Sequence, residues 1–349
     1  MQFRQVAMVT KDGRLEVRKE PIPELKEGMA LIKTHATLIS PGTETKGVKQ
    51  RREQPSASDA KEYRFGYSAA GEILEVCGDF PRLRPGMRVA AMGWHAQHAD
   101  YSCVPVNMLY PIADELPYEQ ACFACLGATS LQSIRRAAPA LGEYGAVLGL
   151  GIVGNLAAQL AQLSGVRVMA WEALDFRIET ARRCGIRNAV NFTKADASKL
   201  AQEFADPYGL DFAVIAFGGD ATKAFEAIYP CMKLSADGHR MGRVVLVGGC
   251  TFAVYGGSRM GNLDVLSSSR TGPGYRDPAY ELGRDYPAAF VQFTTQRNLR
   301  EITELMTEKR LLVEPLITHR VPLAQVGQAV DMLIDKPNET LGVILEMHR

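Results

Sequence analysis

The sequence predicts an α/β protein of two domains, one rich in β-strands and one built on a doubly wound parallel sheet. Two observations support this fold class. Up to about residue 118 the chain consists of short, alternating apolar runs separated by turn signals. After that point, strand-like and helix-like segments alternate. A length of 349 residues fits two domains.

The first part of the chain predicts a small antiparallel β-barrel or sandwich. The strand-like runs are QVAMVT, RLEVRKE, MALIKTHATLI, AAGEILEVCG, MRVAAMG and YSCVPVNMLYPI. Turn signals such as KDG, KEG, SPGTE and RPG separate them. Residues 46–64 are polar and charged, which indicates a solvated loop or helix.

The second part changes to a helical period. PYEQACFACLGATSLQSIRRAAPA predicts a pair of amphipathic helices. The strands expected next are GAVLGL, VRVMAWE, NAVNF, DFAVIAFGG and GRVVLVGG, with helices VGNLAAQLAQLSG, FRIETARRCG and ATKAFEAIYPCMK between them. Strands that alternate with helices predict a parallel sheet. The closing segments are a helix LREITELMTEKR, a strand VEPLITHRV, a helix AQVGQAVDMLID and a strand GVILEM.

Composition excludes several classes of partner. The net charge of +1 gives no indication of a nucleic acid or an anionic membrane as partner. The longest apolar runs have the length of strands, well short of the roughly 20 residues of a membrane helix. The N-terminus alternates like a strand and lacks the apolar core of a signal peptide. We therefore expect a cytoplasmic protein that acts on a small molecule.

Seven cysteines are scattered through the chain, mostly inside apolar runs. A free thiol in such a run behaves as a small hydrophobic group. Cys122 and Cys125 form a single C-x-x-C pair, whereas a structural zinc site needs four ligands. We expect neither a structural zinc site nor a disulfide framework.

The segment AVLGLGIVGN at 146–155 has the spacing G-x-G-x-x-G between an apolar strand and a long helix. In this context Gly149 permits a tight turn, Gly151 lets a pyrophosphate approach the backbone, and Gly154 lets the helix pack on the strand. The helix N-terminus then faces the phosphates with free N–H groups. Ile152 and Val153 lie in the same turn and join the predicted cofactor site.

The second strand ends at Glu172, about 20 residues downstream, as this dinucleotide-binding fingerprint requires. A carboxylate there accepts hydrogen bonds from the ribose hydroxyls and repels a 2′-phosphate, so the sequence predicts NAD as cofactor. Arg177 either stacks on the adenine or lies on a solvated helix face. The remaining predicted cofactor residues follow two later strands: Phe217, Gly248 and Gly249.

These features together resemble the medium-chain dehydrogenase/reductase superfamily over essentially the whole chain. The supporting text includes MALIKTHATLISPGTE, GYSAAGEILEVCG, RPGMRVAAMG and the final ETLGVILEM. The resemblance implies a GroES-like catalytic domain from residues 1–125 and 285–349, and a Rossmann NAD-binding domain from residues 126–284. It also implies a homodimer or homotetramer.

Zinc alcohol dehydrogenases of this superfamily hold a catalytic zinc ion, and the resemblance identifies the corresponding positions. The first ligand, a cysteine, is replaced by Ser40 or Pro41 in LISPGTE. The histidine after glycine is Tyr67, and the glutamate that follows it is Ser68. Only Cys125 corresponds to a remaining ligand. Since catalytic zinc needs three protein ligands, we expect no metal at this site.

One other combination of residues has the ligand types of a zinc site. His95 and His98 form H-x-x-H, and Cys122 and Cys125 form C-x-x-C. However, His98 lies in a polar stretch and the cysteines lie among apolar neighbours. We therefore interpret these residues as structural rather than as a replacement metal site.

A narrower resemblance is to a zinc-free branch of the superfamily. This branch includes the dehydrogenase half of two-part bacterial oxidoreductases, whose other half is similar to glucose–fructose oxidoreductase, and more distantly bacteriochlorophyllide dehydrogenase. The resemblance lies in LISPGTE, GYSAAG, ACLGATSLQSIR, GRDYPAAFVQFTTQRNLREI and VEPLITHRVPL. It implies a polyol, cyclitol or sugar derivative as substrate.

Without zinc, side chains must hold and deprotonate the alcohol oxygen. We predict that Tyr67 is the acid/base and that Glu44 orients it or relays its proton. The charge of a nearby Lys or of NAD⁺ would lower the pKa of Tyr67 from the usual value of about 10. Thr43 lies beside Glu44 where the proton relay of the superfamily begins. His95 is a further catalytic candidate. The predicted substrate pocket is lined by Trp94, Cys125 and Tyr275. Tyr275 and Arg276 lie in a segment that resembles the loop covering the nicotinamide ring in this superfamily.

The sequence thus predicts a zinc-independent, NAD-dependent oxidoreductase that interconverts a secondary alcohol and a ketone. Two alternatives stay open. One is a reductase of a conjugated C=C bond or a quinone, although such enzymes usually prefer NADPH and Glu172 disfavours it. The other is a catalytically silent NAD(H)-binding sensor or partner subunit.

Overall fold

A computed structural model describes residues 2–54, 61–253 and 256–348. The chain forms two compact units, as predicted for an α/β fold with a β-rich domain and a doubly wound domain. Unit 1 contains the residues up to Ala128 and those from Thr271 onward, and unit 2 contains Thr129–Arg270. Residues 271–284, which we had assigned to the nucleotide-binding domain, group with unit 1. The reason is packing, because Tyr280 is buried there and its carbonyl oxygen accepts a hydrogen bond from Asn107 Nδ2 (2.7 Å).

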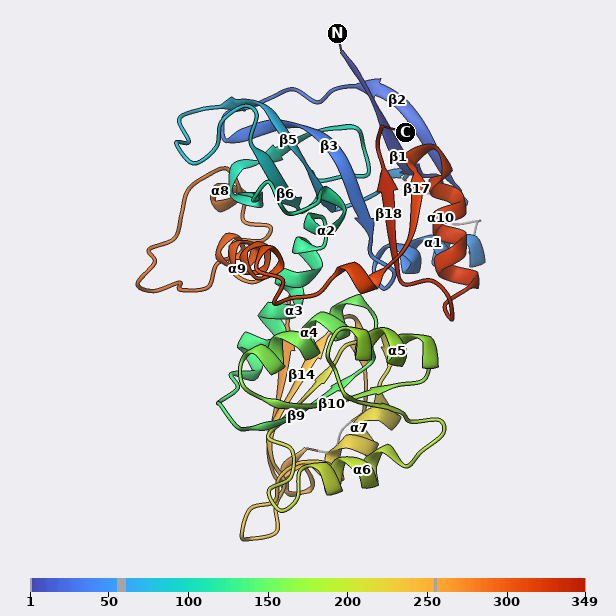
Figure 1. Ribbon diagram of the computed structural model, residues 1–349, viewed down its shortest axis with the longest axis vertical. Helices are drawn as coiled ribbons and strands as arrows, with labels where there is room; N and C mark the ends of the chain where they lie inside the picture. Colours follow the sequence, from blue (N-terminus) through green and yellow to red (C-terminus); the bar gives the residue numbers. More distant parts are fainter. Residues whose placement is uncertain (1, 55–60, 254–255, 349) are drawn as a thin grey trace. The chain divides into compact units, whose positions relative to one another are not determined.

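Unit 1 is built on two β-sheets. A three-stranded sheet has the order β2 (Leu15–Pro21), β1 (Phe3–Val9), β4 (Tyr63–Arg64). A seven-stranded sheet has the order β17 (Ile317–Pro322), β18 (Gly342–Glu346), β3 (Met29–Ile39), β5 (Ser68–Cys77), β6 (Arg88–Met92), β8 (Leu109–Pro111). In that sheet, β7 (Tyr101–Pro105) also pairs with β3. Because β18 pairs antiparallel with β3, the end of the chain returns to the first domain (Figure 1).

The helices of unit 1 cover these sheets. They are α1 (Glu44–Glu53), α2 (Tyr118–Ala121), α8 (Pro278–Glu281), α9 (Thr295–Thr307) and α10 (Val326–Asp335), while α3 (Ala124–Ala137) runs on into unit 2. Helix α1 falls at the start of the polar segment 46–64, and residues 55–60 of that segment lie outside the described residues. One apolar core joins β1, β3, β18 and α10 through buried side chains that include Val9, Ile39, Phe65, Val330 and Leu345.

Unit 2 is a six-stranded parallel sheet. Its order is β11 (Asn188–Asn191), β10 (Arg167–Glu172), β9 (Tyr144–Leu148), β12 (Phe212–Ile215), β14 (Met241–Val247), β16 (Asn262–Ser268). The chain therefore starts in the middle of the sheet, winds to one edge, and then returns to wind to the other. In such sheets ligands bind at the carboxyl ends of the strands where the winding reverses, which here lies between β9 and β12.

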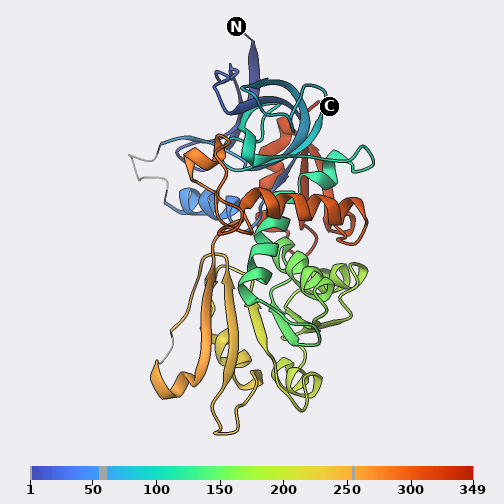
Figure 2. The same ribbon diagram turned by 90° about the vertical axis from the view of Figure 1, so that its left-hand side faces the viewer.

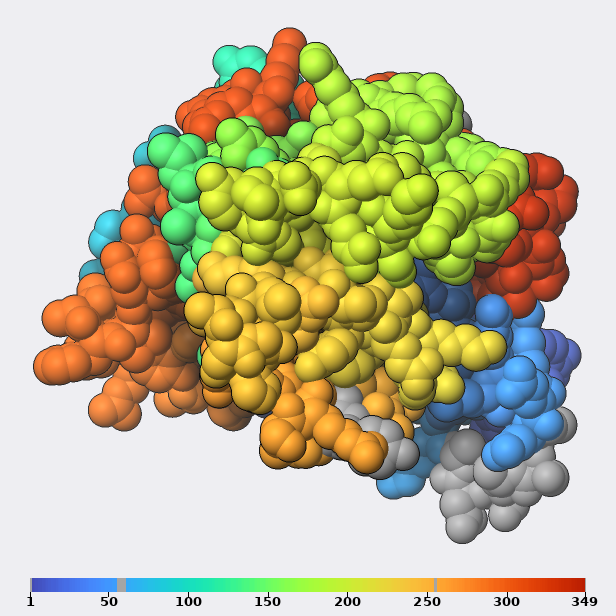
Figure 3. Space-filling view, turned by 90° about the horizontal axis from the view of Figure 1, so that it is seen from below, coloured from blue at the N-terminus to red at the C-terminus, as the bar shows by residue number. Residues whose placement is uncertain are grey.

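Helices lie on both faces of this sheet (Figures 1 and 2). One layer is formed by α4 (Ile152–Leu163) and α5 (Asp175–Arg183), the other by α6 (Ala197–Phe204) and α7 (Thr222–Ile228). The segments around α6 and α7 form the yellow-green and yellow surface of unit 2 seen in Figure 3. Beneath them is an apolar core that includes Leu148, Trp171, Ile215, Phe225 and Val244. A short parallel pair, β13 (Gly219–Asp220) and β15 (Cys250–Thr251), completes the unit.

Within the described ranges, no helix combines the length and the apolar character that crossing a membrane requires.

Candidate active site

The glycine-rich turn after β9 has the geometry of a phosphate cradle. Gly149 has a φ of +92°, and a β-carbon on Gly154 would lie 1.8 Å from the carbonyl oxygen of Gly149. Both positions therefore require glycine. Gly151 differs, because a β-carbon there would meet no protein atom within 4 Å, and it begins α4 without a side-chain cap. Open space in front of uncapped helical N–H groups fits a pyrophosphate.

Glu172 closes this turn from the neighbouring strand. Its buried carboxylate accepts the N–H of Leu150 at Oε2 (2.7 Å) and the N–H of Ala173 at Oε1 (2.8 Å). The Arg177 guanidinium lies 3.7 Å from Oε2. Oε1 also accepts the N–H of Leu174 (3.3 Å), whereas Oε2 keeps a second lone pair that can accept from a hydroxyl, so the group that fixes the turn can also bind a ribose.

The other predicted cofactor residues gather at the same edge of the sheet. The Phe217 ring lies 3.4 Å from where a β-carbon on Gly149 would be. Gly248, with a φ of +100°, lies against the backbone of Phe217, and the carbonyl oxygen of Gly249 accepts the N–H of Gly219 (3.1 Å). Ile152 and Val153 form the first turn of α4. The structure thus brings these residues to the reversal point between β9 and β12.

In unit 1 the side chains of Ser40 and Thr43 lie close enough to the phenol of Tyr67 to lower its pKa. Burial raises the pKa of Tyr67 well above its usual value, and the nearby carboxylate of Glu44 raises it further. No Lys is among the described groups that shift this pKa most, and the main nearby charge is that of Glu44, while lowering by the charge of bound NAD⁺ stays a prediction. The phenol is therefore neutral at physiological pH and keeps a proton that it can donate to a substrate oxygen.

Glu44 is buried at the start of α1 and binds the turn before it. Its Oε2 accepts the N–H of Ser40 (2.6 Å), and its own N–H donates to the carbonyl oxygen of Ser40 (3.0 Å). Its Oε1 lies 3.2 Å from Nε2 of His98. Nδ1 of the His98 ring lies 2.7 Å from Oγ1 of Thr37.

His98 is the residue that the sequence analysis misjudged. We interpreted it as part of a polar stretch, whereas its side chain is fully buried. A weak signal was present, because Ala96 and Ala99 flank it and small residues suit a tightly packed segment. Both alanines are fully buried.

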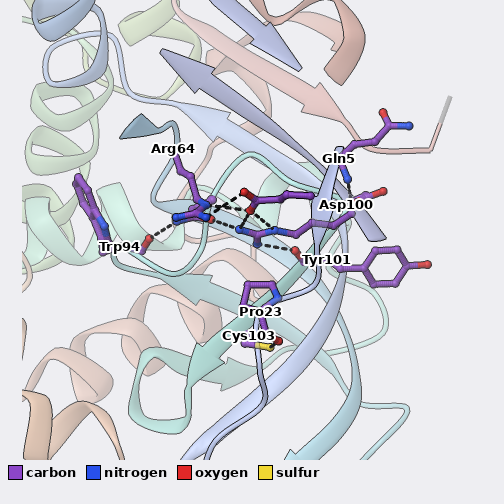
Figure 4. Close-up of polar contacts among 10 residues, drawn as sticks. Gln5, Pro23, Arg64, Trp94, Asp100, Tyr101 and Cys103 are labelled. Carbon is purple, nitrogen blue, oxygen red and sulfur yellow. Dashed lines mark hydrogen bonds and ion pairs between the residues drawn. The ribbon is translucent and has the colours of Figure 1, made fainter. Parts of the chain in front are cut away.

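The segment that carries Trp94 and His95 is tied to the N-terminal strands (Figure 4). Gln97 Nε2 donates to the carbonyl oxygen of Trp94 (3.2 Å), and Gln97 Oε1 accepts from Nη2 of the buried Arg4 (2.8 Å). Arg4 also binds Glu20. The Trp94 indole points away from these contacts and is 60% exposed. These contacts fix the backbone and leave the indole available.

The remaining predicted residues are placed differently. Tyr275 lies beside Gly93, with its Cε2 3.9 Å from where a β-carbon on Gly93 would be, so it neighbours the Trp94 segment. His95 is exposed, and in the described part of the chain it makes no hydrogen bond with Tyr67 or Glu44. The structure therefore groups Thr43, Glu44 and Tyr67 but not His95.

Known proteins share parts of this sequence and its fold. Residues 153–275 match the family described as zinc-binding dehydrogenase. An alcohol dehydrogenase of Geobacillus stearothermophilus is 27% identical over 259 residues, which cover 67% of this chain and 74% of that enzyme. Alcohol dehydrogenase 2 of rice (japonica) is 27% identical over 256 residues, covering 71% of this chain and 60% of the rice enzyme.

The sequence likeness is to zinc-binding dehydrogenases in residues 153–275 and to alcohol dehydrogenases over about two thirds of the chain. Solved structures share the fold over nearly the whole length. An Escherichia coli oxidoreductase/dehydrogenase of unknown specificity has a TM-score of 0.82 at 16% identity, with 100% of both chains covered. A putative zinc-binding dehydrogenase from Sinorhizobium meliloti bound to NADP has a TM-score of 0.77 at 18% identity, covering 99% of this chain and 100% of the other. Galactitol-1-phosphate dehydrogenase from Escherichia coli has a TM-score of 0.77 at 18% identity, covering 98% and 100%.

The residues at the superfamily's catalytic zinc position do not fit a zinc ion. Burial raises the pKa of the Cys125 thiol to about 12, although hydrogen bonds from the Gly93 backbone and Ser68 partly offset this. A catalytic zinc ion needs three protein ligands, and Cys125 is the one usual zinc ligand among Ser40, Tyr67, Ser68 and Cys125. Tyr67 supplies a neutral phenol in place of an imidazole, and Ser68 Oγ donates to the carbonyl oxygen of Cys122 (2.6 Å).

The alternative set of histidines and cysteines does not form a metal centre either. Cys122 Sγ donates to the carbonyl oxygen of Glu119 (3.3 Å), and burial raises the pKa of Cys122 well above its usual value. His98 binds Thr37 and faces Glu44, as described above. Among the described residues, no group of three or more His, Cys, Asp or Glu side chains is arranged to hold a metal ion.

Proposed function

We propose that this protein is a zinc-independent, NAD-dependent dehydrogenase that interconverts a secondary alcohol and a ketone. The observation that carries the proposal is the neutral phenol of Tyr67, held by Ser40 and Thr43 at the superfamily's zinc-ligand position. The matched relatives are alcohol dehydrogenases, which supports an oxidoreductase acting on alcohols.

The cofactor residues support a nicotinamide dinucleotide. The turn from Gly149 to Gly154 would receive the pyrophosphate, and Glu172 would accept the ribose hydroxyls. When bound, this cofactor supplies the hydride acceptor or donor of the reaction. A 2′-phosphate would meet the buried carboxylate of Glu172, which favours NAD over the NADP bound by the Sinorhizobium meliloti neighbour.

Tyr67 would hold the substrate oxygen and move its proton. In the direction of ketone reduction, the neutral phenol donates a hydrogen bond to the carbonyl oxygen and then its proton. In the direction of alcohol oxidation, the phenol takes the alcohol proton while passing its own to the hydroxyl of Ser40 or Thr43, and that hydroxyl releases its own proton to water. Its raised pKa disfavours a free phenolate in either direction, so both transfers must be concerted.

Substrate class is supported by the aromatic side chains near this position. The exposed Trp94 indole, and Tyr275 beside Gly93, offer rigid amphipathic surfaces. We propose a polyol, cyclitol or sugar derivative, and galactitol-1-phosphate dehydrogenase shows that the fold accommodates a sugar alcohol phosphate in a neighbour. The cytoplasmic location and the homodimer or homotetramer stay predictions.

The experiment is NADH formation from NAD⁺ with a panel of polyols, cyclitols and sugars, in the presence of a metal chelator. The proposal expects turnover of at least one compound and little turnover with NADP⁺. Turnover that disappears with chelator and returns with zinc would contradict the proposal. Reduction of enones or quinones instead would favour the reductase alternative, and NAD⁺ binding without any turnover would favour the sensor.

A further inference from the structure

We propose that His98 is a positioning residue of the proton-handling site: it holds Glu44, and Glu44 holds the turn that presents the hydroxyls of Ser40 and Thr43 to Tyr67. This inference rests on the proposed function in that it gives Tyr67 the role of proton donor. It assigns His98, Thr37 and the Ser40–Glu44 turn to one connected support.

His98 is fixed from several sides before it meets Glu44. Its Nδ1 lies 2.7 Å from Oγ1 of Thr37 on β3. Its ring packs edge-on against Phe65, with centroids 5.0 Å apart. Its backbone N–H donates to the carbonyl oxygen of Phe65 (2.8 Å), and its carbonyl oxygen accepts the N–H of Ala7 (2.9 Å). The ring therefore has one orientation, with Nε2 directed to Glu44.

The contact between His98 and Glu44 is buried, and no other described group takes the place of either partner. Nε2 and Oε1 lie 3.2 Å apart, with the side chains 0% and 6% exposed. Neither atom has another hydrogen-bond partner in the described structure, and their own contact is imperfectly aligned. A buried carboxylate oxygen without a partner is costly, so Glu44 is stabilised here only when an N–H approaches Oε1.

Glu44 transmits this constraint to the turn before α1. Its Oε2 accepts the Ser40 N–H at 2.6 Å, and its N–H donates to the Ser40 carbonyl oxygen at 3.0 Å. The side chain and the backbone of Glu44 thus close the same turn. Loss of the contact at Oε1 lets the carboxylate rotate, which weakens the hydrogen bond between Oε2 and the Ser40 N–H.

Thr43 shows that the turn serves the phenol. Thr43 is the N-cap residue of α1, yet its side chain makes no capping hydrogen bond. A threonine at this position usually accepts from a helical N–H, which stabilises the helix. Here its hydroxyl lies close enough to Tyr67 to lower the pKa of the phenol, as does the side chain of Ser40. The helix therefore lacks the stabilisation of a side-chain cap, and the Thr43 hydroxyl remains available to the site.

The segment around Tyr67 is shaped to pass close to His98. Gly66 has a φ of +111°, and a β-carbon there would lie 2.2 Å from the His98 backbone nitrogen. The carbonyl oxygen of Tyr67 accepts the N–H of Gly93 (2.9 Å). Only glycine before Tyr67 allows the two segments to approach in this way.

The test follows the Tyr67 phenol directly. Protein labelled with ¹³C at the tyrosine ζ carbon gives a Tyr67 signal that is assigned by its absence in Tyr67→Phe. We expect His98→Leu to move this signal, Thr37→Val to move it less, and His98→Gln to keep it near the wild-type position, because Gln keeps a donor near Oε1. The control is Ile73→Val. Ile73 is fully buried on β5, the strand that begins directly after Tyr67, so this variant should lower thermal stability without moving the signal.

Two outcomes overturn the inference. One is an unmoved Tyr67 signal in folded His98→Leu. The second applies if His98→Leu does not fold. It is a Tyr67 signal at the wild-type position in both Thr37→Val and His98→Gln. These readouts need no substrate, so they are independent of the proposed activity.

A kinetic measurement separates the inference from the proposed function. With a substrate from the panel, we expect His98→Leu to lower kcat on the order of tenfold or more with KM little changed, and His98→Gln to recover most of it. A moved Tyr67 signal in a protein without turnover would refute the dehydrogenase and leave the positioning role intact. Turnover in wild type with an unmoved signal would refute the positioning role alone.

Discussion

A β-carbon on Gly66 would lie 2.2 Å from the backbone nitrogen of His98, and Gly66 has a φ of +111°. Gly66→Ala must therefore strain the backbone and displace His98. We expect its thermal midpoint to fall by several degrees more than that of Gly86→Ala. Gly86 also has a positive φ, +83°, but a β-carbon there meets nothing within 4 Å, so it reports the backbone strain of about 1–2 kcal/mol alone. Equal midpoints in the two variants, by calorimetry, would contradict the close approach.

Gly151 and Gly154 predict opposite effects of the same substitution. Gly151→Ala places a methyl group where no protein atom lies within 4 Å, so the fold should be unaffected while NADH binds more weakly by about tenfold or more. Gly154→Ala brings a β-carbon to 1.8 Å from the carbonyl oxygen of Gly149, so the fold itself should be destabilised. NADH titration and thermal unfolding of both variants separate these cases. Unchanged NADH affinity in Gly151→Ala would contradict binding of the pyrophosphate at this turn.

Glu172 should decide between the two nicotinamide cofactors. Glu172→Gln removes the negative charge that a 2′-phosphate would meet, yet keeps an oxygen that can accept from the Leu150 N–H. We expect the ratio of the NADPH and NADH dissociation constants to fall by about tenfold or more. Equilibrium titration of both cofactors measures it. A ratio that does not move would remove Glu172 from cofactor selection.

The raised pKa of Cys125 makes stability depend on pH in the alkaline range. Burial raises this pKa from 9.0 to about 12, so the unfolded chain loses the proton first. The stabilisation is fully present below pH 9 and is lost as the pH rises from 9 toward 12. Tyr67 adds to the loss at the upper end of this range. We expect the thermal midpoint of Cys125→Ala to fall less steeply above pH 9 than that of wild type.

A core substitution gives the control for this pH dependence. Ile73→Val carries no titratable group, so its midpoint should run parallel to wild type at every pH. Parallel curves for Cys125→Ala and wild type would mean that the thiol is not shielded as described.

The fold was largely predictable because its signals are local. The strand before the G-x-G-x-x-G turn, the helix after it, and Glu172 at the end of the next strand all follow from spacing, and the structure shows each of them. β16 and α6 were not predicted. The exposed, polar pattern of β16 gives no strand period, and α6 is a helix of only eight residues.

The candidate site was less predictable because its contacts are distant in sequence. Glu44 and Tyr67 attracted attention by what they replace, but nothing near His98 in the sequence shows that it meets Glu44. The segment 271–284 shows the same limit, since it joins unit 1 only through contacts such as that between Asn107 and Tyr280. The protein charges near Tyr67 also depend on such contacts, and the main one is that of Glu44.

The most direct measurement is kcat for Tyr67→Phe beside Tyr110→Phe and wild type, in protein stripped of metal and assayed with chelator. Tyr110 lies on β8 and is half-buried, so it controls for loss of a tyrosine hydroxyl elsewhere in unit 1. The account predicts full activity in wild type and Tyr110→Phe, and a loss of about 10²-fold or more in Tyr67→Phe. Equal turnover in all three proteins would contradict the central claim that the Tyr67 phenol does the work of the metal.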